Sequence, residues 1–249
     1  MDLARLEREH YGVWYEVCAA DEYRLRNLDF TPELIVDIGA NVGSFTAHAK
    51  TLFPAAEVIA VEPNDANLAV AREIIGPEPG VRFLRAALGR GPVFWLHGPG
   101  PGNHSYFGPQ FGYELEKIRA DSRQYELVDV PTVMLGDLVA PDEPRPYIVK
   151  IDTEGAEAVL IGDEASRNVL RRAAYWAAEI HFYRIDWEAP ETGQTPEERY
   201  LSHHGQIIRQ RLDWIYGFCG SHDVQLKLWL SGALAHLRRR PEADGQRYL

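Results

Sequence analysis

Carboxylate side chains end two apolar runs of this 249-residue sequence, at positions where a buried strand would give way to a turn. In residues 35–45 the run ends in Asp37, and glycines follow at positions 39 and 43. In residues 147–157 the run ends in Asp152, and two more acids follow within five residues. Carboxylates in such positions can accept hydrogen bonds from a ligand, attract a cation or take up a proton. Both stretches are therefore candidates for ligand binding or catalysis.

The turn that begins at Gly39 has features of a nucleotide site at the carboxyl end of a sheet. Gly39 can adopt backbone angles closed to other residues, and its missing side chain would let a ligand lie against the backbone. A dinucleotide site uses Gly-x-Gly-x-x-Gly to hold a pyrophosphate, whereas this turn reads Gly-Ala-Asn-Val-Gly. Asp37 would repel a pyrophosphate but attract a cationic amino-acid group and its sulfonium. S-adenosylmethionine has that charge distribution and NAD does not, so the turn predicts S-adenosylmethionine.

Glu62 ends the next predicted strand, where a carboxylate can accept hydrogen bonds from both hydroxyls of a ribose. Either Glu62 or Asp37 alone is about equally well explained as the cap of a turn. Together, each at the end of a strand that leads into a helix, the two acids favour a cofactor site.

The second stretch places three acids at the end of one strand. Asp152 and Glu154 would face the same side if the extended backbone continues that far. Glu157 would lie in the first turn of the following helix. The alternative is that these acids cap the helix while Lys150 forms a surface salt bridge. Capping alone does not require three acids, so the stretch remains a candidate site.

Regular strands and helices must position both stretches. Strands alternate with helices from residue 33 onward, which implies a mostly parallel sheet with helices on both faces. The predicted strands are 33–38, 57–62, 81–85, 127–134, 147–151, 174–182 and 223–230. The predicted helices are 42–53, 65–75, one that starts in 155–161, and 195–218. Pro131 predicts an edge strand or a bulge, and the segment 98–112, rich in glycine and proline, is predicted to hold no regular element.

The pattern as a whole favours a single domain of residues 1–249. Residues 1–30 have apolar residues at helical spacing and are predicted to form a helical cap. Residues 31–190 form the predicted cofactor-binding core, and residues 191–249 supply a C-terminal helix and the final strand. The compact basic run at 238–240 is interpreted as a solvated helix end, because cations favour helix C-termini.

Composition excludes several classes of protein. The chain has 26 Lys and Arg against 37 Asp and Glu, a net charge of −11 that disfavours binding to nucleic acid. No apolar run is long enough for a membrane-spanning helix, and the charged N-terminus is unlike a signal peptide. Cys18 and Cys219 are too few for a disulfide scaffold. We therefore expect a cytoplasmic protein that contacts neither nucleic acid nor membrane.

The sequence resembles the FkbM family of S-adenosylmethionine-dependent methyltransferases over about residues 34–182. The pattern Asp-x-Gly-x-Asn-x-Gly alone indicates a class I methyltransferase, and its combination with Lys-Ile-Asp-x-Glu-Gly-x-Glu is more specific. One departure is Gly136 before Asp137, where the family often has an acidic pair. The matching segments, in the family's order, are residues 36–43, 61–64, 87–89, 132–138 and 150–157.

The resemblance implies a Rossmann-like class I methyltransferase sheet and methyl transfer to a hydroxyl of a sugar or natural-product intermediate. Transfer is an in-line displacement that yields S-adenosylhomocysteine, so the protein must hold the cofactor, align the acceptor and supply a base. Asn64, Ala86 and Ala87 are expected near the adenine. The full set of cofactor-binding residues implied is Asp37, Gly39, Ala40, Asn41, Gly43, Phe45, Glu62, Pro63, Asn64, Ala86, Ala87 and Asp152.

The catalytic base is expected at the end of strand 174–182. Glu179 and His181 would share one face there, and the imidazole of His181 titrates near neutral pH, which suits a proton acceptor. Glu154 is the alternative base, and Asp152 would line the gap between cofactor and acceptor. Asp152, Glu179 and His181 could instead hold a divalent metal ion, although we expect none.

The expected partner is a small-molecule acceptor, over which the segment 98–112 could close as a lid. The residues after 190 could cover the site or form the contact of a homodimer. The alternatives are an N-methyltransferase, a peptide or RNA methylase, and a non-catalytic scaffold that binds the cofactor. A dehydrogenase of the same general fold would bind NAD instead.

Overall fold

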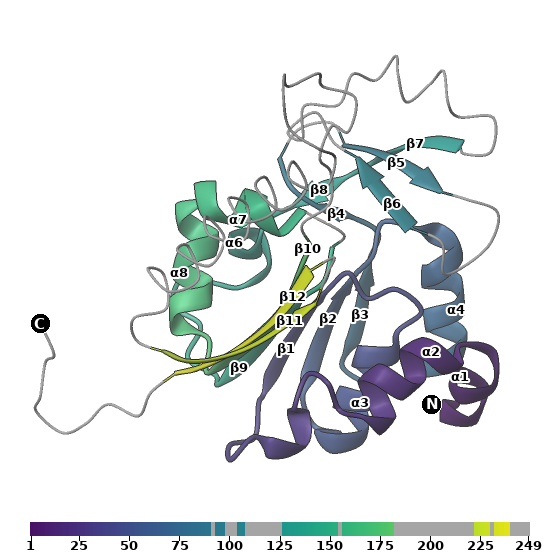
Figure 1. Ribbon diagram of the computed structural model, residues 1–249, viewed down its shortest axis with the longest axis horizontal. Helices are drawn as coiled ribbons and strands as arrows, with labels where there is room; N and C mark the ends of the chain where they lie inside the picture. Colours follow the sequence, from purple (N-terminus) through teal and green to yellow (C-terminus); the bar gives the residue numbers. More distant parts are fainter. Residues whose placement is uncertain are drawn as a thin grey trace, which may run out of the picture.

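A seven-stranded sheet forms the centre of the protein (Figure 1). The computed structural model describes residues 1–90, 93–97, 104–107, 126–153, 156–181, 222–229 and 232–239. The strand order is β11-β12-β10-β9-β1-β2-β3, and every pairing is parallel except those made by β12. The mostly parallel sheet of the predicted fold class is therefore confirmed. Its strands are β1 (Leu34–Ile38), β2 (Glu57–Val61), β3 (Val81–Leu84), β9 (Tyr147–Ile151), β10 (Tyr175–His181), β11 (His222–Trp229) and β12 (Gly232–Arg239).

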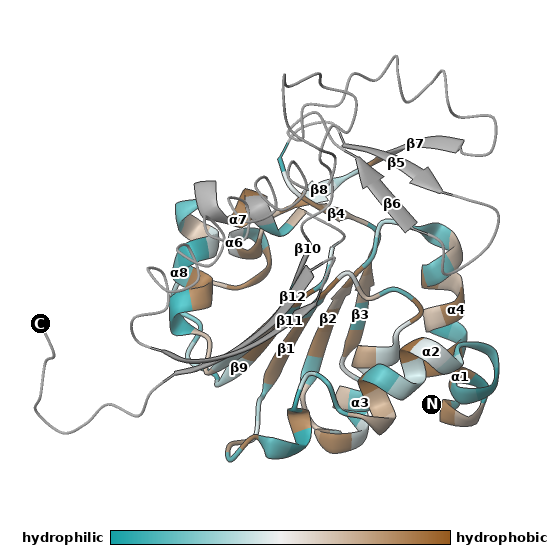
Figure 2. Ribbon diagram, viewed as in Figure 1, coloured by the Kyte–Doolittle hydropathy of each residue, from teal (hydrophilic) through white to brown (hydrophobic). Residues whose placement is uncertain are grey.

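Helices cover both faces of this sheet because successive strand residues point to opposite sides. On one face, apolar residues of β1, β2 and β9 pack against α1 (Leu3–Glu9), α3 (Ser44–Leu52) and α4 (Asp65–Ile75). On the other face, the alternate residues pack against α6 (Leu135–Leu138), α7 (Val159–Gly162) and α8 (Glu164–Arg172). Figure 2 shows hydrophobic residues concentrated along the central strands. None of the helices in the described part of the chain is both long and apolar enough to cross a membrane.

The order of the strands changes direction between β1 and β9. From β1 the chain continues through α3 to β2 on one side, whereas β9 joins on the other side after β2 and β3 are complete. A crevice forms outside the carboxyl ends of parallel strands at such a point, and open α/β sheets bind their ligands there. Asp37 of β1 lies opposite Lys150 of β9 in the register of the two strands. The two stretches singled out in the sequence therefore meet at this point.

The cap differs from the continuous helix predicted for residues 1–30. It consists of α1, α2 (Tyr11–Trp14), a π-helical turn (Tyr15–Ala19) and a 3₁₀ turn (Leu25–Asn27). Asp21 and Arg24 have positive φ angles of 51° and 55°, which no helix accommodates. The Asp21 side chain accepts the backbone N–H groups of Leu25 and Arg26, and such local hydrogen bonds compete with a helix. The prediction of a single helix was therefore wrong.

A second, three-stranded sheet lies beyond the carboxyl ends of the central strands (Figure 1). It contains β5 (Val93–His97), β6 (His104–Phe107) and β7 (Glu126–Val130). The prediction that residues 98–112 hold no regular element was wrong for 104–107, because backbone pairing with β5 outweighs the nearby glycines and prolines. The predicted strand 127–134 is interrupted at Pro131, as that residue implied. Its second part, β8 (Thr132–Val133), pairs with β4 (Ala87–Leu88).

Near the C-terminus, the predicted strand 223–230 is confirmed as β11. The interpretation of 238–240 as a helix end was wrong, since Arg238 and Arg239 belong to β12. That strand pairs with β10 on one side and β11 on the other, and this double pairing decides its conformation. The predicted helix 195–218 lies outside the described residues. The helix predicted to start in 155–161 begins as a 3₁₀ turn, Ala156–Ala158, and continues as α7.

Candidate functional site

A buried ion pair joins β1 to β9 at the point where the strand order changes direction. The residue Asp37 is 0% exposed and Lys150 is 3% exposed. Lys150 Nζ lies 3.4 Å from Asp37 Oδ1 and donates a hydrogen bond of 2.6 Å to the carbonyl oxygen of Gly39. Thr46 of α3 donates to Asp37 Oδ2 at 2.7 Å. The sequence suggested that Asp37 attracts the cationic part of a ligand, whereas the structure places the ammonium group of Lys150 beside it. Lys150 is also buried, so it does not form the surface salt bridge that was considered as the alternative.

Gly39 directly follows β1 and lies against the backbone that follows β9. Its φ is +80°, and a Cβ atom on it would lie 1.7 Å from the carbonyl oxygen of Asp152. The Asp152 N–H in turn donates to the carbonyl oxygen of Ile38 at 2.9 Å. Glycine is therefore required here by the neighbouring backbone, in addition to any ligand that approaches the turn.

The Asp152 carboxylate makes two side-chain interactions that the motifs did not predict. Tyr23, from the cap, donates its hydroxyl to Asp152 Oδ2 at 3.2 Å, and Lys150 Nζ lies 3.6 Å from the same oxygen. The Asp152 side chain is still 27% exposed. The Lys150 ammonium also lies 5.7 Å from the centre of the Tyr23 ring and 6.0 Å from that of Phe45, within the range of cation–π attraction. The Asp152 carboxylate thus lies beside a phenol and an ammonium group, and the ammonium group lies close to two aromatic rings.

The protonation states follow from burial and charge. Burial by itself lowers the pKa of Lys150, but the carboxylates of Asp37 and Asp152 outweigh it, and the net pKa is raised. Burial, followed by the negative charge of Asp152, raises the pKa of Tyr23 well above its usual value. The charge of Glu179 contributes to both shifts, so Glu179 belongs to the same electrostatic cluster. Lys150 is therefore an ammonium, and Tyr23 a hydrogen-bond donor, at neutral pH.

Glu62 lies directly after β2 and is 4% exposed. Its carboxylate accepts the backbone N–H groups of Asn41 at 2.8 Å and Asn64 at 3.0 Å, and the Asn67 amide at 3.2 Å. Burial outweighs these hydrogen bonds and raises the pKa of Glu62 to about 7. Asn67 was not among the predicted site residues, because it lies inside helix α4, where no motif distinguishes it.

The polar groups around Glu62 fit a ligand that carries both donors and acceptors. Burial disfavours the charged form of Glu62 despite the three hydrogen bonds that it accepts, and further donors such as ribose hydroxyls would favour that form. The side-chain nitrogen of Asn64 is buried and has no hydrogen-bond partner among the residues that the structure describes, so it can donate to an acceptor of the same ligand. Ala86 and Ala87 are both buried and follow β3, and Ala87 begins β4, where it pairs with Thr132 of β8. The residues present thus fit the adenosine part of S-adenosylmethionine.

The turn between Gly39 and Gly43 connects the ion pair of Asp37 and Lys150 to the polar residues around Glu62. The N–H groups of Gly39 and Ala40 both donate to the carbonyl oxygen of Val61 at 2.9 Å. Asn41 and Gly43 have positive φ angles of 51° and 84°, and Asn41 is the residue bound to Glu62. Among the other predicted cofactor residues, Phe45 is buried beneath Lys150, whereas Pro63 is half-buried between β2 and α4.

The predicted catalytic residues are located only in part. Glu157, which was not among them, accepts hydrogen bonds from the N–H of Thr153 at 3.0 Å and from its hydroxyl at 2.9 Å, so it caps the start of the turn to which it belongs. The backbone of His181 ends β10 at the carboxyl edge, but its side chain lies outside the described part of the structure, as does the whole of Glu154. Among the described side chains, no three His, Cys, Asp or Glu form a group able to hold a metal ion.

The sequence model of the family described as "Methyltransferase FkbM domain" matches residues 37–211, more than half of the chain. Solved structures of similar fold include precorrin-6y C5,15-methyltransferase from Geobacter metallireducens, 14% identical over 89% of this chain and 86% of that one, with a TM-score of 0.44.

Two further solved structures are similar to this chain. A SAM-dependent methyltransferase from Aquifex aeolicus is 11% identical over 96% of this chain and 100% of that one, with a TM-score of 0.43. An rRNA methylase from Streptococcus thermophilus is 12% identical over 89% and 94%, with a TM-score of 0.44. No curated protein matches the chain. On the strength of the family match and of the site that it spans, the chain belongs to the FkbM family of S-adenosylmethionine-dependent methyltransferases.

Proposed function

We propose that this methyltransferase transfers the methyl group of S-adenosylmethionine to a hydroxyl of a small molecule, such as a sugar or a natural-product intermediate. The observation that carries the proposal is the carboxylate of Asp152, which is held by Tyr23 and Lys150 yet 27% exposed at the crevice. A small acceptor can reach such a group. The net charge of −11 further disfavours an RNA acceptor.

Each part of the site has a proposed task. The bound cofactor supplies an activated methyl group. Glu62 accepts hydrogen bonds from the ribose hydroxyls, and Asn64 binds beside the adenine. Asp152 faces the sulfonium, where its negative charge favours the cationic donor over the neutral product. His181 takes up the proton of the acceptor hydroxyl, with Glu154 as the alternative base.

Binding of the cofactor product is the first test. S-adenosylhomocysteine at a hundredfold excess over its Kd is expected to raise the melting temperature by about 5–10 °C, because a ligand that binds only the folded protein stabilises it by mass action. NAD at the same concentration is expected to leave the melting temperature unchanged. Differential scanning fluorimetry measures both. An equal response to the two ligands would contradict the assignment of the cofactor.

The class of acceptor is tested with the same protein. Radiolabelled S-adenosylmethionine is incubated with hydroxylated sugars, with amines, with peptides and with RNA, and transfer of label is counted. Label on the hydroxylated compounds alone supports the proposal. Label on peptide or RNA would replace the small-molecule acceptor, and binding without any transfer would indicate a scaffold that retains the cofactor site.

Ionisation of Glu62 predicts that binding depends on pH. The folded protein holds a proton on Glu62 up to about pH 7, whereas ribose hydroxyls donate best to the ionised form. The affinity for S-adenosylhomocysteine is therefore expected to increase by up to about tenfold per pH unit as pH rises towards 7, and to level off above it. Isothermal titration calorimetry in two buffers of different ionisation enthalpy should also detect proton release on binding.

A Glu62→Gln variant is the control for that dependence. It should bind more weakly and lose the slope with pH, since the amide does not titrate in this range. Retention of the full slope in the variant would assign the titration to another group.

The raised pKa of Glu62 also has a consequence for the stability of the ligand-free protein. The contribution of Glu62 to the free energy of unfolding is fully present below pH 4.5 and is lost as pH rises through about 7.

A further inference from the structure

Tyr23 lies on a turn whose backbone is unusual on both sides. Asp21 and Arg24 have the positive φ angles of 51° and 55°, and a π-helical turn, Tyr15–Ala19, comes just before them. Left-handed backbone at residues other than glycine costs about 1–2 kcal/mol each, so surrounding interactions must maintain it. Residues with such backbone cluster at active sites and ligand-binding sites.

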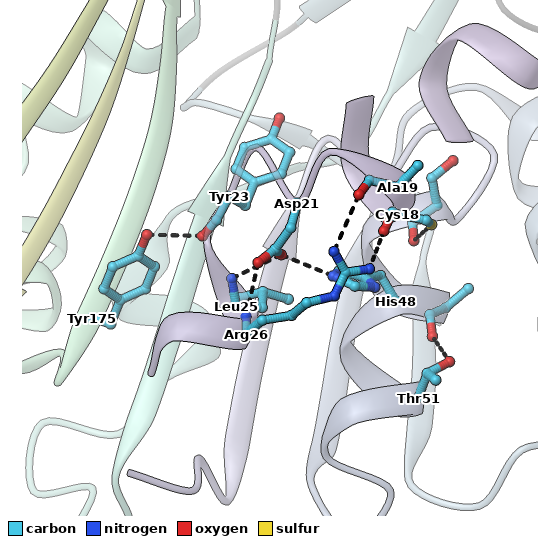
Figure 3. A network of polar contacts seen from close by, with 11 residues as sticks. Cys18, Ala19, Asp21, Tyr23, Leu25, Arg26, His48, Thr51 and Tyr175 are labelled. Atoms are coloured by element: carbon cyan, nitrogen blue, oxygen red, sulfur yellow. Dashed lines mark hydrogen bonds and ion pairs between the residues drawn. The ribbon is translucent and has the colours of Figure 1, made fainter. Parts of the chain in front are cut away.

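Several hydrogen bonds hold this turn in place (Figure 3). His48 of α3 places Nε2 2.9 Å from Asp21 Oδ1, and both side chains are buried. Arg26 donates to the carbonyl oxygens of Cys18 and Ala19, which ties the turn to the π-helical segment. The hydroxyl of Tyr175, on β10, donates to the carbonyl oxygen of Tyr23 at 2.8 Å. The turn is thereby fixed to both the helix layer and the sheet.

The side chain of Tyr23 is equally constrained. Only 4% of the residue is exposed, and its ring contacts the edge of Phe45, with 5.3 Å between ring centres and planes at 85°. In this setting the hydroxyl reaches one oxygen of Asp152, the same Oδ2 that lies 3.6 Å from Lys150 Nζ. An apolar phenylalanine would fill the same space without that contact, so the hydroxyl has a purpose beyond packing.

We propose that Tyr23 is a positioning residue of the active site, which orients the Asp152 carboxylate toward the sulfonium of the cofactor. The cap is then part of the cofactor site, although the family match begins only at residue 37. The inference rests on the proposed role of Asp152. The preference for cationic S-adenosylmethionine over neutral S-adenosylhomocysteine then depends on the hydroxyl of Tyr23, a residue of the cap.

The test compares Tyr23→Phe with Tyr147→Phe in the full-length protein. Tyr147 is also buried and donates its hydroxyl to a carbonyl oxygen, that of Val169 at 2.6 Å, but it begins β9 and so lies at the opposite end of that strand from Asp152. Calorimetry measures the Kd of S-adenosylmethionine and of S-adenosylhomocysteine for each variant. Tyr23→Phe is expected to weaken the binding of S-adenosylmethionine by about tenfold, the effect of losing one hydrogen bond to a charged group. The binding of S-adenosylhomocysteine should weaken much less. Tyr147→Phe should leave the ratio of the two Kd values unchanged.

An Asp152→Asn variant separates the inference from the proposed function. It should weaken binding of S-adenosylmethionine more than binding of S-adenosylhomocysteine, as Tyr23→Phe does, and adding Tyr23→Phe to it should have no further effect, because the two residues act through one contact. If the wild-type protein binds neither ligand, the proposed function fails. If it binds both but Tyr23→Phe leaves the ratio unchanged, or acts additively with Asp152→Asn, the role of Tyr23 is overturned while the proposed function stands.

Discussion

A Gly39→Ala variant is expected to lose more than about 4 kcal/mol of stability, together with measurable cofactor binding. The added Cβ would lie 1.7 Å from the carbonyl oxygen of Asp152, and that oxygen belongs to backbone at the end of β9, which cannot rotate away. The clash would force β1 and β9 apart at the point where the cofactor is proposed to bind. Urea unfolding measures the stability, and calorimetry with S-adenosylhomocysteine measures the binding.

Gly80→Ala is the matched control for this prediction. Gly80 has a φ of +78°, nearly that of Gly39, but no atom closer than 3.6 Å to an added Cβ. Its substitution should therefore cost only the left-handed conformation of alanine, about 1–2 kcal/mol, and leave binding intact. The difference between the two variants isolates the close approach of the strands. Equal losses would show that the backbone angle, and not the contact with Asp152, is what requires glycine at position 39.

Lys150→Met is expected to destabilise the protein by about 3–5 kcal/mol, since it leaves the Asp37 carboxylate buried without a compensating charge. Asp37 is 0% exposed and its ammonium partner lies at 3.4 Å, so water cannot replace the lost charge without opening the core. The variant also removes the hydrogen bond to Gly39 and the ion pair with Asp152. Thermal and urea unfolding measure the loss.

The double variant Lys150→Met with Asp37→Asn tests the cause. Asparagine keeps a side-chain oxygen for the Thr46 hydroxyl, which donates to Asp37 Oδ2 in the wild type, but it carries no charge. Stability should therefore recover in part relative to Lys150→Met alone, with a coupling energy above about 1 kcal/mol. Strictly additive losses would mean that packing around the Lys150 side chain, rather than charge compensation, accounts for its burial.

The sequence was most informative where chemistry and secondary structure are local. Asp37, Glu62 and Asp152 each follow an apolar run that only a buried strand explains, and the parallel topology then places the three at one edge of the sheet. The glycine pattern similarly identified the turn between β1 and α3. Such features depend on neighbours within a few residues, and the main strands were predicted to within one or two residues for the same reason.

The residues that complete the site could not be found in this way. Tyr23 and Thr46 reach the acids from the cap and from α3, and only tertiary packing brings them there. The burial of Lys150 was missed because its opposite charge lies on a different strand, far away in sequence. Strand β12 was missed for a related reason, since its conformation is fixed by pairing with strands on both sides rather than by its own composition.

Because Tyr23 donates its hydroxyl to Asp152, the hydrogen bonds of this carboxylate extend beyond residues 37–211, which the family model matches. A minimal enzyme trimmed to residues 37–211 would retain every acid of the motifs yet discard the group that fixes one of them. On the proposal that Tyr23 positions Asp152, such a shortened protein would keep its signature motifs and still lose its preference for the methyl donor over the demethylated product.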